Sequence, residues 1–360
     1  MKFHRANLAQ LETFDEVIDV RSPAEYALDH IPGAINAPVL DDAQRAEIGT
    51  LYRTSPFAAR RAGAALVAQN IGTHIAALFR DKDKSWRPLV YCWRGGMRSG
   101  AMTHVLRQVG WQAAQLEGGY KAFRREVIAQ LDALAPCFRY IVLCGETGSG
   151  KSRLLNALVA QGEQVLDLEG LACHRGSVLG QVPQSIQPAQ KHFETGLWQA
   201  LRNFDAARPV YVEAESKKIG ALHVPDALMH TIRNAECVQL RVPLAERVRF
   251  LLEEYAYFVD DPALLLQQLD CLQPLYGNEI VSQWRALIDG GDWAGFVAAV
   301  LTAHYDPLYR RSTRQNFVRF GEAMRLELDA LNIASIEQAA AALVSRDAGS
   351  AAALRASLKA

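Results

Sequence analysis

Short apolar runs recur along the chain, and most of them are followed by a polar segment and then by apolar residues at helical spacing. In the first half the runs occupy residues 17–20, 35–37 and 89–91. In the second half they occupy residues 140–144, 165–168, 210–213 and 238–242, and Met324, Leu326 and Leu328 alternate as a last strand. Strands that alternate with helices predict an α/β fold with a parallel sheet in each half.

The length and one proline divide the chain into domains. With 360 residues, the chain is long enough for two domains of about 150 residues each. Pro136 stands between a helical pattern and the next apolar run, which is typical of a linker. We therefore expect one domain over residues 11–134, a second over 138–330 with a largely helical stretch at 244–305, and a C-terminal helix or tail over 331–360.

Composition limits the classes of function. The 39 basic and 39 acidic residues cancel, which excludes a broadly basic nucleic-acid coat but leaves room for local patches. The six cysteines form no CxxC pair, so we expect free thiols and neither a disulfide framework nor a zinc site. No apolar run approaches the about 20 residues of a membrane span, and no signal core follows Met1. We expect a cytoplasmic protein.

A cysteine loop follows the apolar run at 89–91. The nucleophile candidate is Cys92, and a helical pattern begins just after the loop. Backbone amides of such a loop converge on one point, and the helix N-terminus adds positive potential that favours the thiolate. A buried strand-end cysteine is the simpler interpretation, but two glycines and two arginines contribute nothing to a core. We therefore predict an anion-binding loop formed by Arg94, Gly95, Gly96, Met97, Arg98 and Ser99.

A second anion-binding loop fits GxxxxGK[ST], with a strand before it and a helix after it. Its residues are Gly145, Glu146, Thr147, Gly148, Ser149, Gly150, Lys151 and Ser152. The glycines let the backbone wrap a diphosphate, Lys151 meets the outer phosphate, and Ser152 is the candidate ligand for Mg²⁺. The motif predicts a bound diphosphate and leaves two reactions open: phosphoryl transfer, or departure of diphosphate from carbon.

An acidic residue on a neighbouring strand normally accompanies such a loop. Asp167 and Glu169 follow one apolar run, and Glu213 and Glu215 end another. Neither pair has the usual pattern of an apolar run followed directly by Asp, so each of these carboxylates is either a partner of the loop or a structural or solvated group. His174 and Arg175, between glycines and serine, either contact diphosphate or tRNA or cap a loop.

The N-terminal half resembles a rhodanese domain, a parallel-sheet domain whose cysteine carries sulfur or a similar atom. One difference from that family is that five residues separate Cys92 from Arg98, one more than in the usual sulfur-transfer loop. A wider loop suits a tetrahedral oxyanion, so a Cys-x5-Arg phosphatase is an alternative. The resemblance depends on Asp19-Val20-Arg21, Glu25-Tyr26, His30-Ile31-Pro32-Gly33-Ala34, the Cys92 loop and Glu117-Gly118-Gly119-Tyr120.

The order of the two loops makes the whole chain resemble the tRNA 2-selenouridine synthases, a rhodanese domain fused to a P-loop NTPase-like α/β domain. The supporting stretches are 167–172, His174-Arg175-Gly176-Ser177, Ile219-Gly220, Glu253-Glu254-Tyr255 and Tyr305-Asp306-Pro307-Leu308-Tyr309. The resemblance implies two steps on the wobble 2-thiouridine of tRNA: S-geranylation by geranyl diphosphate, then replacement of the S-geranyl group by selenium from selenophosphate. It also implies that Cys92 carries selenium as an S-selanyl adduct.

The same resemblance implies the partners. They are tRNA, geranyl diphosphate and selenophosphate, without a tightly bound cofactor, DNA or membrane. From the loop length we expect Arg94 and Arg98 to orient selenophosphate. The alternatives are an ATP-dependent sulfurtransferase or small-molecule kinase that uses Cys92 as carrier, and a nucleotide-driven switch in which Cys92 is dispensable.

Two groups of residues have two interpretations each. Tyr255, Tyr257 and Phe258 either line a prenyl pocket or form core. The basic clusters either gather into a tRNA-binding face or are solvated surface pairs; they are Arg60-Arg61, Arg124-Arg125, Lys217-Lys218 and Arg310-Arg311 with Arg314.

Overall fold

The computed structural model describes residues 5–176, 186–270 and 272–357. Its chain forms two compact units: unit 1 comprises Met1–Gln130 with Pro188–Gln199, and unit 2 comprises Leu131–Gln187 with Ala200–Ala360. Two of the three unit boundaries fall inside helices, α5 (Gly119–Leu134) and α8 (Gln190–Asn203), and the third lies just before α8. Ser177 of the sequence motif and Cys271 lie outside the described residues.

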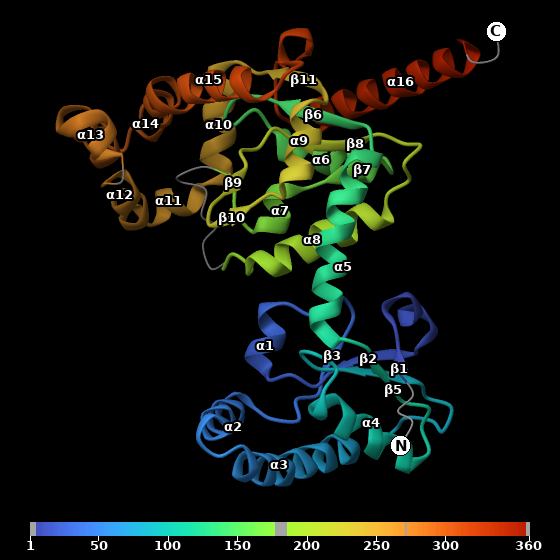
Figure 1. Ribbon diagram of the computed structural model, residues 1–360. Helices are drawn as coiled ribbons and strands as arrows, with labels where there is room; N and C mark the ends of the chain where they lie inside the picture. The colour runs from blue at the N-terminus through green and yellow to red at the C-terminus, as the bar shows by residue number, and fades with distance from the viewer. Residues whose placement is uncertain (1–4, 177–185, 271, 358–360) are drawn as a thin grey trace. The chain divides into compact units, whose positions relative to one another are not determined.

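Unit 1 contains a sheet of five parallel strands in the order β1-β5-β4-β2-β3 (Figure 1). The strands are β1 (Arg5–Ala6), β2 (Glu16–Asp19), β3 (Ile35–Asn36), β4 (Pro88–Tyr91) and β5 (Ala114–Leu116). Besides α5 and part of α8, its helices are η1 (Leu8–Thr13), α1 (Pro23–Leu28), α2 (Asp42–Thr54), α3 (Pro56–Ala76) and α4 (Met97–Val109). The sequence pattern did not predict β1, because two residues are too few to show an alternation.

Local sequence signals explain the helix starts of unit 1. Ser22 and Glu25 form a capping box at the start of α1, and Pro23 occupies its first turn. The core packs Val90 of β4 against Met102 and Leu106 of α4. This packing fixes the segment between β4 and α4, which contains Cys92.

Unit 2 contains a second parallel sheet, in the order β12-β11-β6-β8-β7. Its strands are β6 (Tyr140–Cys144), β7 (Gln164–Leu166), β8 (Val210–Glu213), β11 (Glu236–Arg241) and β12 (Met324–Glu327), and a small antiparallel pair joins β9 (Lys218–Ile219) to β10 (Leu222–His223). The shorter helical segments around it are η2 (Ala135–Cys137), α6 (Lys151–Ala160), α7 (Leu168–Ala172), α9 (Asp226–Arg233) and η4 (Phe320–Glu322). Together with unit 1, this sheet confirms the predicted fold class.

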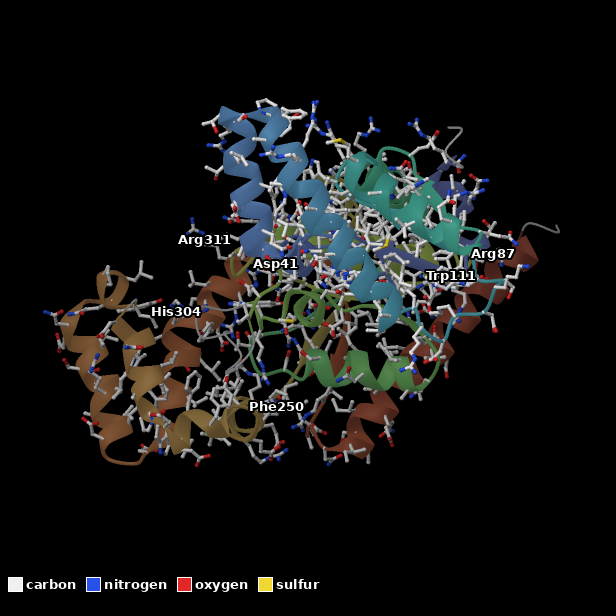
Figure 2. The ribbon with its side chains drawn as sticks, turned by 90° about the horizontal axis from the view of Figure 1, so that it is seen from below. Asp41, Arg87, Trp111, Phe250, His304 and Arg311 are labelled. Carbon is white, nitrogen blue, oxygen red and sulfur yellow. The ribbon has the colours of Figure 1, made fainter. Side chains whose placement is uncertain are left out.

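A helical region of unit 2 lies between β11 and β12, as the helical pattern at 244–305 predicted. It comprises α10 (Leu244–Glu254), α11 (Ala256–Asp260), α12 (Pro262–Asp270), α13 (Gln273–Asp289), α14 (Trp293–Val300), the π-helical turn η3 (Leu301–Tyr305) and α15 (Asp306–Asn316). Figure 2 labels Phe250 of α10 and His304 of η3. Phe258, Trp284 and Phe296 share one apolar core there.

The C-terminal segment is a continuous helix, α16 (Ile333–Ser357). Ile336 and Leu343 of α16 belong to the same apolar core as Leu154 of α6 and Ile141 of β6. The segment after residue 331 thus completes the core of unit 2. The domain boundaries expected from the sequence stay predictions. In the described part of the chain, none of the helices has both the length and the apolar surface that a bilayer crossing needs.

Parallel strands end at a common edge, so the loops that follow them gather there. In unit 1 the Cys92 loop follows β4, which lies between β5 and β2. In unit 2 the loop 145–150 follows β6, whose neighbour β8 ends at Glu213. Each sheet therefore brings one predicted anion-binding loop to its carboxyl edge.

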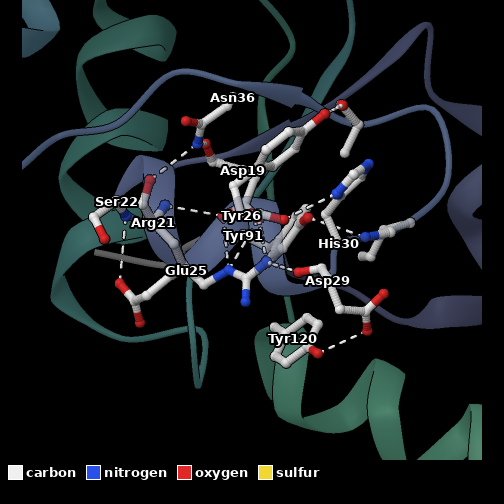
Figure 3. Close-up of polar contacts among 12 residues, drawn as sticks. Asp19, Arg21, Ser22, Glu25, Tyr26, Asp29, His30, Asn36, Tyr91 and Tyr120 are labelled. Atoms are coloured by element: carbon white, nitrogen blue, oxygen red, sulfur yellow. Dashed lines mark hydrogen bonds and ion pairs between the residues drawn. The ribbon is translucent and has the colours of Figure 1, made fainter. Parts of the chain in front are cut away.

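A buried ion pair organises that edge in unit 1 (Figure 3). The Arg21 guanidinium donates to both oxygens of Asp19, at 3.0 Å from Nε to Oδ1 and 2.5 Å from Nη2 to Oδ2, and both side chains are almost completely buried. Arg21 also donates to the Asp29 carbonyl at 2.7 Å, and its guanidinium carbon lies 3.9 Å from the centre of the Tyr120 ring. Burial acts to lower the pKa of Arg21, but Asp19 outweighs it and raises the pKa.

We expect Arg21→Ala to lower the free energy of unfolding by about 3–5 kcal/mol, because it leaves the Asp19 carboxylate buried without its partner. The matched control is Arg87→Ala, which breaks the exposed pair with Asp15 and should leave stability nearly unchanged. Guanidinium titration followed by tryptophan fluorescence measures both. Equal losses in the two variants would contradict this account.

Candidate active site

The Cys92 sulfur lies at the start of a hydrogen-bonded loop. Cys92 is 3% exposed, and its Sγ accepts hydrogen bonds from the Gly96 amide at 3.3 Å and from the Ser99 hydroxyl at 3.1 Å. The Gln115 amide of β5 in turn donates to Ser99 Oγ at 2.8 Å and to the Gly96 carbonyl at 2.9 Å. Two donors therefore point at the sulfur beside the N-terminus of α4, which is the arrangement predicted from the sequence.

The start of α5 fixes this loop from the other side. The Tyr120 amide donates to the Cys92 carbonyl and the Lys121 amide to the Trp93 carbonyl, both at 2.9 Å. Gly119 has a φ of +55°, and a Cβ there would lie 2.2 Å from the Cys92 carbonyl oxygen. Only glycine permits this approach of α5 to the loop.

The two arginines of the loop differ in their partners. Arg98 donates to Glu25 of α1 at 2.7 Å. Burial acts to raise the pKa of Glu25, but the hydrogen bond and charge of Arg98 outweigh it, and the pKa is lowered. Arg94 is exposed and lines a cavity with Gly118, Lys121 and Arg125. The charge of Arg94 faces this cavity, whereas that of Arg98 is engaged by Glu25.

The loop of unit 2 wraps the start of α6. Gly148 and Gly150 have φ values of +80° and +78°, and the Lys151 ammonium donates to the Gly145 carbonyl at 2.7 Å. The Gly145 amide donates to the Tyr309 hydroxyl at 2.6 Å. Burial raises the pKa of Tyr309 well above its usual value, so this phenol stays neutral. Sequence reasoning named Tyr309 without a role, and the structure places its hydroxyl at the loop.

A buried arginine that the sequence did not single out holds this loop to α15. Arg247 donates to both oxygens of Asp306 at 2.8 Å and to the Thr147 carbonyl at 3.1 Å. Glu146 contacts both Arg247, at 3.3 Å, and Arg310, at 2.6 Å. The amphipathic helix α10 has two arginines, and nothing in the sequence distinguishes Arg247 from Arg249, which is why Arg247 was missed.

The four predicted carboxylates gather at the ends of β7 and β8. Asp167 caps α7 by accepting from the Gly170 amide at 2.7 Å, and Glu213 accepts from the Glu169 amide at 2.7 Å. The other oxygen of Glu213 is buried without a hydrogen-bond partner. Glu169 accepts from the Ser152 hydroxyl at 3.5 Å. Asp167, Glu169 and Glu215 therefore line the cavity of the loop, whereas Glu213 lies outside its lining.

These carboxylates raise one another's pKa values. Burial, then the carboxylates of Asp167 and Glu169, raise the pKa of Glu213 well above its usual value. Burial and the neighbouring Glu169 raise the pKa of Glu215 to about 8. Within the described ranges no three Asp, Glu, His or Cys side chains are grouped as a ready-made metal site. The cluster thus carries excess negative charge that a cation or protons would relieve.

His174 and Arg175 lie at the rim of the same cavity. His174 Nδ1 accepts from the Gly176 amide at 3.1 Å, and burial lowers the pKa of this imidazole. Arg175 pairs with Glu254 at 3.2 Å and lies over the Tyr255 ring, 4.7 Å from its centre. The structure thus brings both residues to the loop cavity, and Arg175 also reaches the helical region.

Two cavities of unit 2 meet beside the loop. The first is lined by residues 147–152, among others, and has a volume of about 2140 Å³, its open mouth included. The second has about 600 Å³ on the same measure and an almost wholly apolar lining. They share Thr147, Leu251, Tyr255 and Tyr305, and the rest of the apolar lining is Leu252, Phe258, Val259, Leu265, Trp293, Phe296, Val297, Val300 and Leu301. Of the three aromatic residues considered from the sequence, Tyr255 and Phe258 line this pocket.

The basic clusters do not share one environment. Arg124 is buried and donates to Glu194 and Thr195, whereas Arg125 is exposed. Lys217 pairs with Asp226, and Arg310 with Glu146. Among the described residues, Cys92, Cys137, Cys144 and Cys237 form no disulfide.

Replacement of Gly119 tests the close approach of α5 to the Cys92 loop. We expect Gly119→Ala to lower the free energy of unfolding by about 3 kcal/mol, because it adds a clash to a strained φ. Gly110→Ala is the matched control: its φ is +112°, but a Cβ there meets nothing within 4 Å. It should cost about 1 kcal/mol from φ strain alone. Urea titration distinguishes the two, and a loss no larger at Gly119 would be inconsistent with the clash.

The raised pKa of Glu215 predicts a pH dependence. The folded chain holds a proton that an unfolded carboxyl with a pKa of 4.5 releases, so this group's contribution to stability is lost as pH rises through about 8. Ionised Glu215 also repels an anion in the loop. We expect the affinity for inorganic pyrophosphate to fall by about tenfold more between pH 6.5 and pH 9 in the native protein than in Glu215→Gln. Calorimetric titration measures this, and parallel pH profiles would exclude Glu215 as the cause.

Comparison with known proteins agrees with this geometry. Residues 138–270 match the family model of the tRNA 2-selenouridine synthase AAA domain, and residues 4–126 match that of the rhodanese-like domain. The tRNA 2-selenouridine synthase of Nitrosomonas europaea is 37% identical over 244 residues, which cover 66% of this chain and 63% of that relative. That of Alcanivorax borkumensis is 32% identical over 329 residues, which cover 81% of this chain and 88% of the relative.

A solved rhodanese-related protein from Thermoplasma volcanium is 20% identical, with a TM-score of 0.23, and the match covers 34% of this chain and 93% of that one. The Cys92 loop lies within the rhodanese-like match, and the loop 145–152 lies within the AAA-domain match. Because the likeness to the Alcanivorax relative extends over most of both sequences, the chain belongs to the tRNA 2-selenouridine synthase family.

Proposed function

We propose that this protein is an enzyme that acts on tRNA and replaces the sulfur of wobble 2-thiouridine by selenium in two steps. In the first step geranyl diphosphate alkylates the sulfur, and in the second step selenium from selenophosphate displaces geranylthiol. The names of the relatives support selenation of tRNA. The apolar pocket that opens beside the diphosphate-binding loop is the observation that supports the geranyl step.

The pocket fits a ligand with a diphosphate head and an apolar tail. The loop 145–152 supplies donors for the head, and the pocket offers aromatic and aliphatic walls with almost no polar surface. Each buried methylene contributes about 0.8 kcal/mol, so a ten-carbon chain gains several kcal/mol there. A nucleotide, whose ribose and base carry many polar atoms, gains no such energy from an apolar wall. This contrast favours geranyl diphosphate over ATP.

In the first step the 2-thio sulfur attacks C1 of the geranyl group while the C1–O bond breaks and diphosphate leaves. Negative charge grows on the diphosphate oxygens, and the amides of the loop with Lys151 stabilise it. Lys151 exchanges its bond to the Gly145 carbonyl for one to the phosphate. The product carries a thioether sulfur at C2, which leaves as a thiol far more readily than a thiocarbonyl sulfur.

Mg²⁺ is a proposed companion of the diphosphate. The Ser152 hydroxyl and Glu169 lie together at the loop, and the unpartnered oxygen of Glu213 and the raised pKa of Glu215 mark a site with surplus negative charge. When bound there, the ion would neutralise charge on the departing diphosphate. Oxygen ligands of this kind suit Mg²⁺.

In the second step we assign Cys92 as the selenium carrier. Cys92 enters this step as a mixed disulfide with a small thiol. The selenium of selenophosphate attacks the Cys92 sulfur and displaces that thiol, and water then cleaves the Se–P bond and releases phosphate. The resulting S-selanyl group attacks C2 while geranylthiol leaves. A thiol from solution then attacks the Cys92 sulfur, releases the 2-selenouridine and restores the mixed disulfide, so turnover requires a small thiol. Arg94 lines the cavity beside this loop and has no ion pair with a described residue, whereas Arg98 is paired with Glu25.

We expect Cys92→Ser to abolish selenation and to leave geranylation intact. We expect Lys151→Ala to lower the geranylation rate at least 100-fold, because it removes the charge that meets the leaving group. Mass analysis of thiolated tRNA nucleosides, after incubation with geranyl diphosphate and then with selenophosphate, measures both steps. Loss of both steps in Cys92→Ser would contradict the assignment of one step to each loop. ATP hydrolysis stimulated by a thiol acceptor would favour the sulfurtransferase alternative.

A larger side chain in the apolar pocket should weaken binding of the geranyl tail without affecting binding of the diphosphate head. Val297 of α14 lines the pocket but not the loop cavity. We expect Val297→Trp to weaken geranyl diphosphate binding by at least tenfold and to leave the affinity for inorganic pyrophosphate unchanged, whereas Val297→Leu changes neither by much. Calorimetric titration measures both ligands. Unchanged geranyl diphosphate binding in a folded Val297→Trp variant would rule out this pocket.

A further inference from the structure

An exposed indole stands directly after the nucleophile of unit 1. Trp93 is 36% exposed although it adjoins the buried Cys92. Its ring packs against Tyr120, with centroids 5.3 Å apart, and its carbonyl accepts from the Lys121 amide. Tyr120 is itself buried and lies on the Arg21 guanidinium. The ring is therefore held by Tyr120, and part of it is exposed to solvent.

Four cations surround this ring and the loop mouth. Arg94, Lys121 and Arg125 line one cavity, and the Lys191 ammonium lies 5.4 Å from the centre of the Trp93 ring. All four side chains are exposed, and none has an ion pair with any described residue. By contrast, the neighbouring Arg98 and Arg124 are paired with Glu25 and Glu194. The unpaired charges therefore concentrate where the Cys92 loop opens.

An open aromatic face beside unpaired cations is the signature of a site for single-stranded nucleic acid. Bases stack on such a ring with about 1–3 kcal/mol each, and the cations take the phosphates. A small tetrahedral anion alone would need the charges but not the indole. The combination thus favours an RNA loop over a free anion as the occupant.

We propose that Trp93, Arg94, Lys121, Arg125 and Lys191, here called the Trp93 platform, bind single-stranded RNA of the anticodon loop. A nucleophile approaches C2 perpendicular to the base plane, so the modified uridine must turn its face toward Cys92. Trp93 therefore stacks on a neighbouring base, while Arg94, Lys121 and Arg125 contact the backbone phosphates. The proposal rests on the proposed function for the identity of the RNA.

The test is binding of a fluorescently labelled, unmodified anticodon stem–loop RNA to the full chain, followed by anisotropy. We expect Trp93→Ala to weaken binding about tenfold and Trp93→Phe to retain most of the affinity, because phenylalanine still stacks. We expect Lys121→Ala and Arg125→Ala each to reduce the slope of log K against log salt by about 0.7. Lys84→Ala is the matched control, because Lys84 is an exposed lysine that precedes β4, at the opposite end of the strand from Cys92.

Unchanged RNA affinity in Trp93→Ala would overturn the stacking role, and salt slopes in Lys121→Ala and Arg125→Ala equal to that of Lys84→Ala would overturn the phosphate contacts. Weakened selenophosphate binding with unchanged RNA binding would also overturn the proposal, because the cations would then serve a small anion. The proposed function fails separately. Absence of selenation by the native protein, with the binding pattern as expected, would refute the reaction and leave the platform standing.

Discussion

The geometry of the sulfur-bearing loop depends on one buried charge, that of Arg21. Its guanidinium joins Asp19 at the end of β2 to the Asp29 carbonyl and to the ring of Tyr120. The amide of Tyr120 holds the Cys92 carbonyl, so the pair connects the end of one strand to the loop that follows its neighbour. A buried ion pair contributes little net stability, but its directional bonds determine where each element ends.

Unit 2 repeats this arrangement with other residues. Arg247 is buried, binds Asp306 through two parallel bonds and donates to the Thr147 carbonyl of the loop 145–150. In both units, then, a bidentate arginine–carboxylate pair lies beneath a glycine-rich loop at the carboxyl edge of a parallel sheet. A buried ion pair thus fixes the position of each glycine-rich loop.

Much of this could be predicted from the sequence, and the limits have physical causes. Strand–loop–helix order and the glycine motifs are local properties of the sequence, so the two sheets and the positions of Cys92 and Lys151 could be predicted. The apolar pocket was not, because α10, α11, α12, α14 and η3 form it together and no one of them shows it. Likewise, the bond between Tyr309 and Gly145 joins residues far apart in the chain. The role of Asp167 as a helix cap, however, follows from a pattern visible in the sequence.

The pair between Arg98 and Glu25 has a consequence for discrimination among anions. Phosphate and sulfate resemble selenophosphate in shape and charge and are far more abundant in cells. With Arg98 paired to Glu25, one of the two arginines of the loop offers little net charge to an anion. In the proposed second step selenium bonds to the Cys92 sulfur, an interaction that phosphate and sulfate lack. Under that proposal, discrimination comes from the covalent bond and not from the charge of the loop.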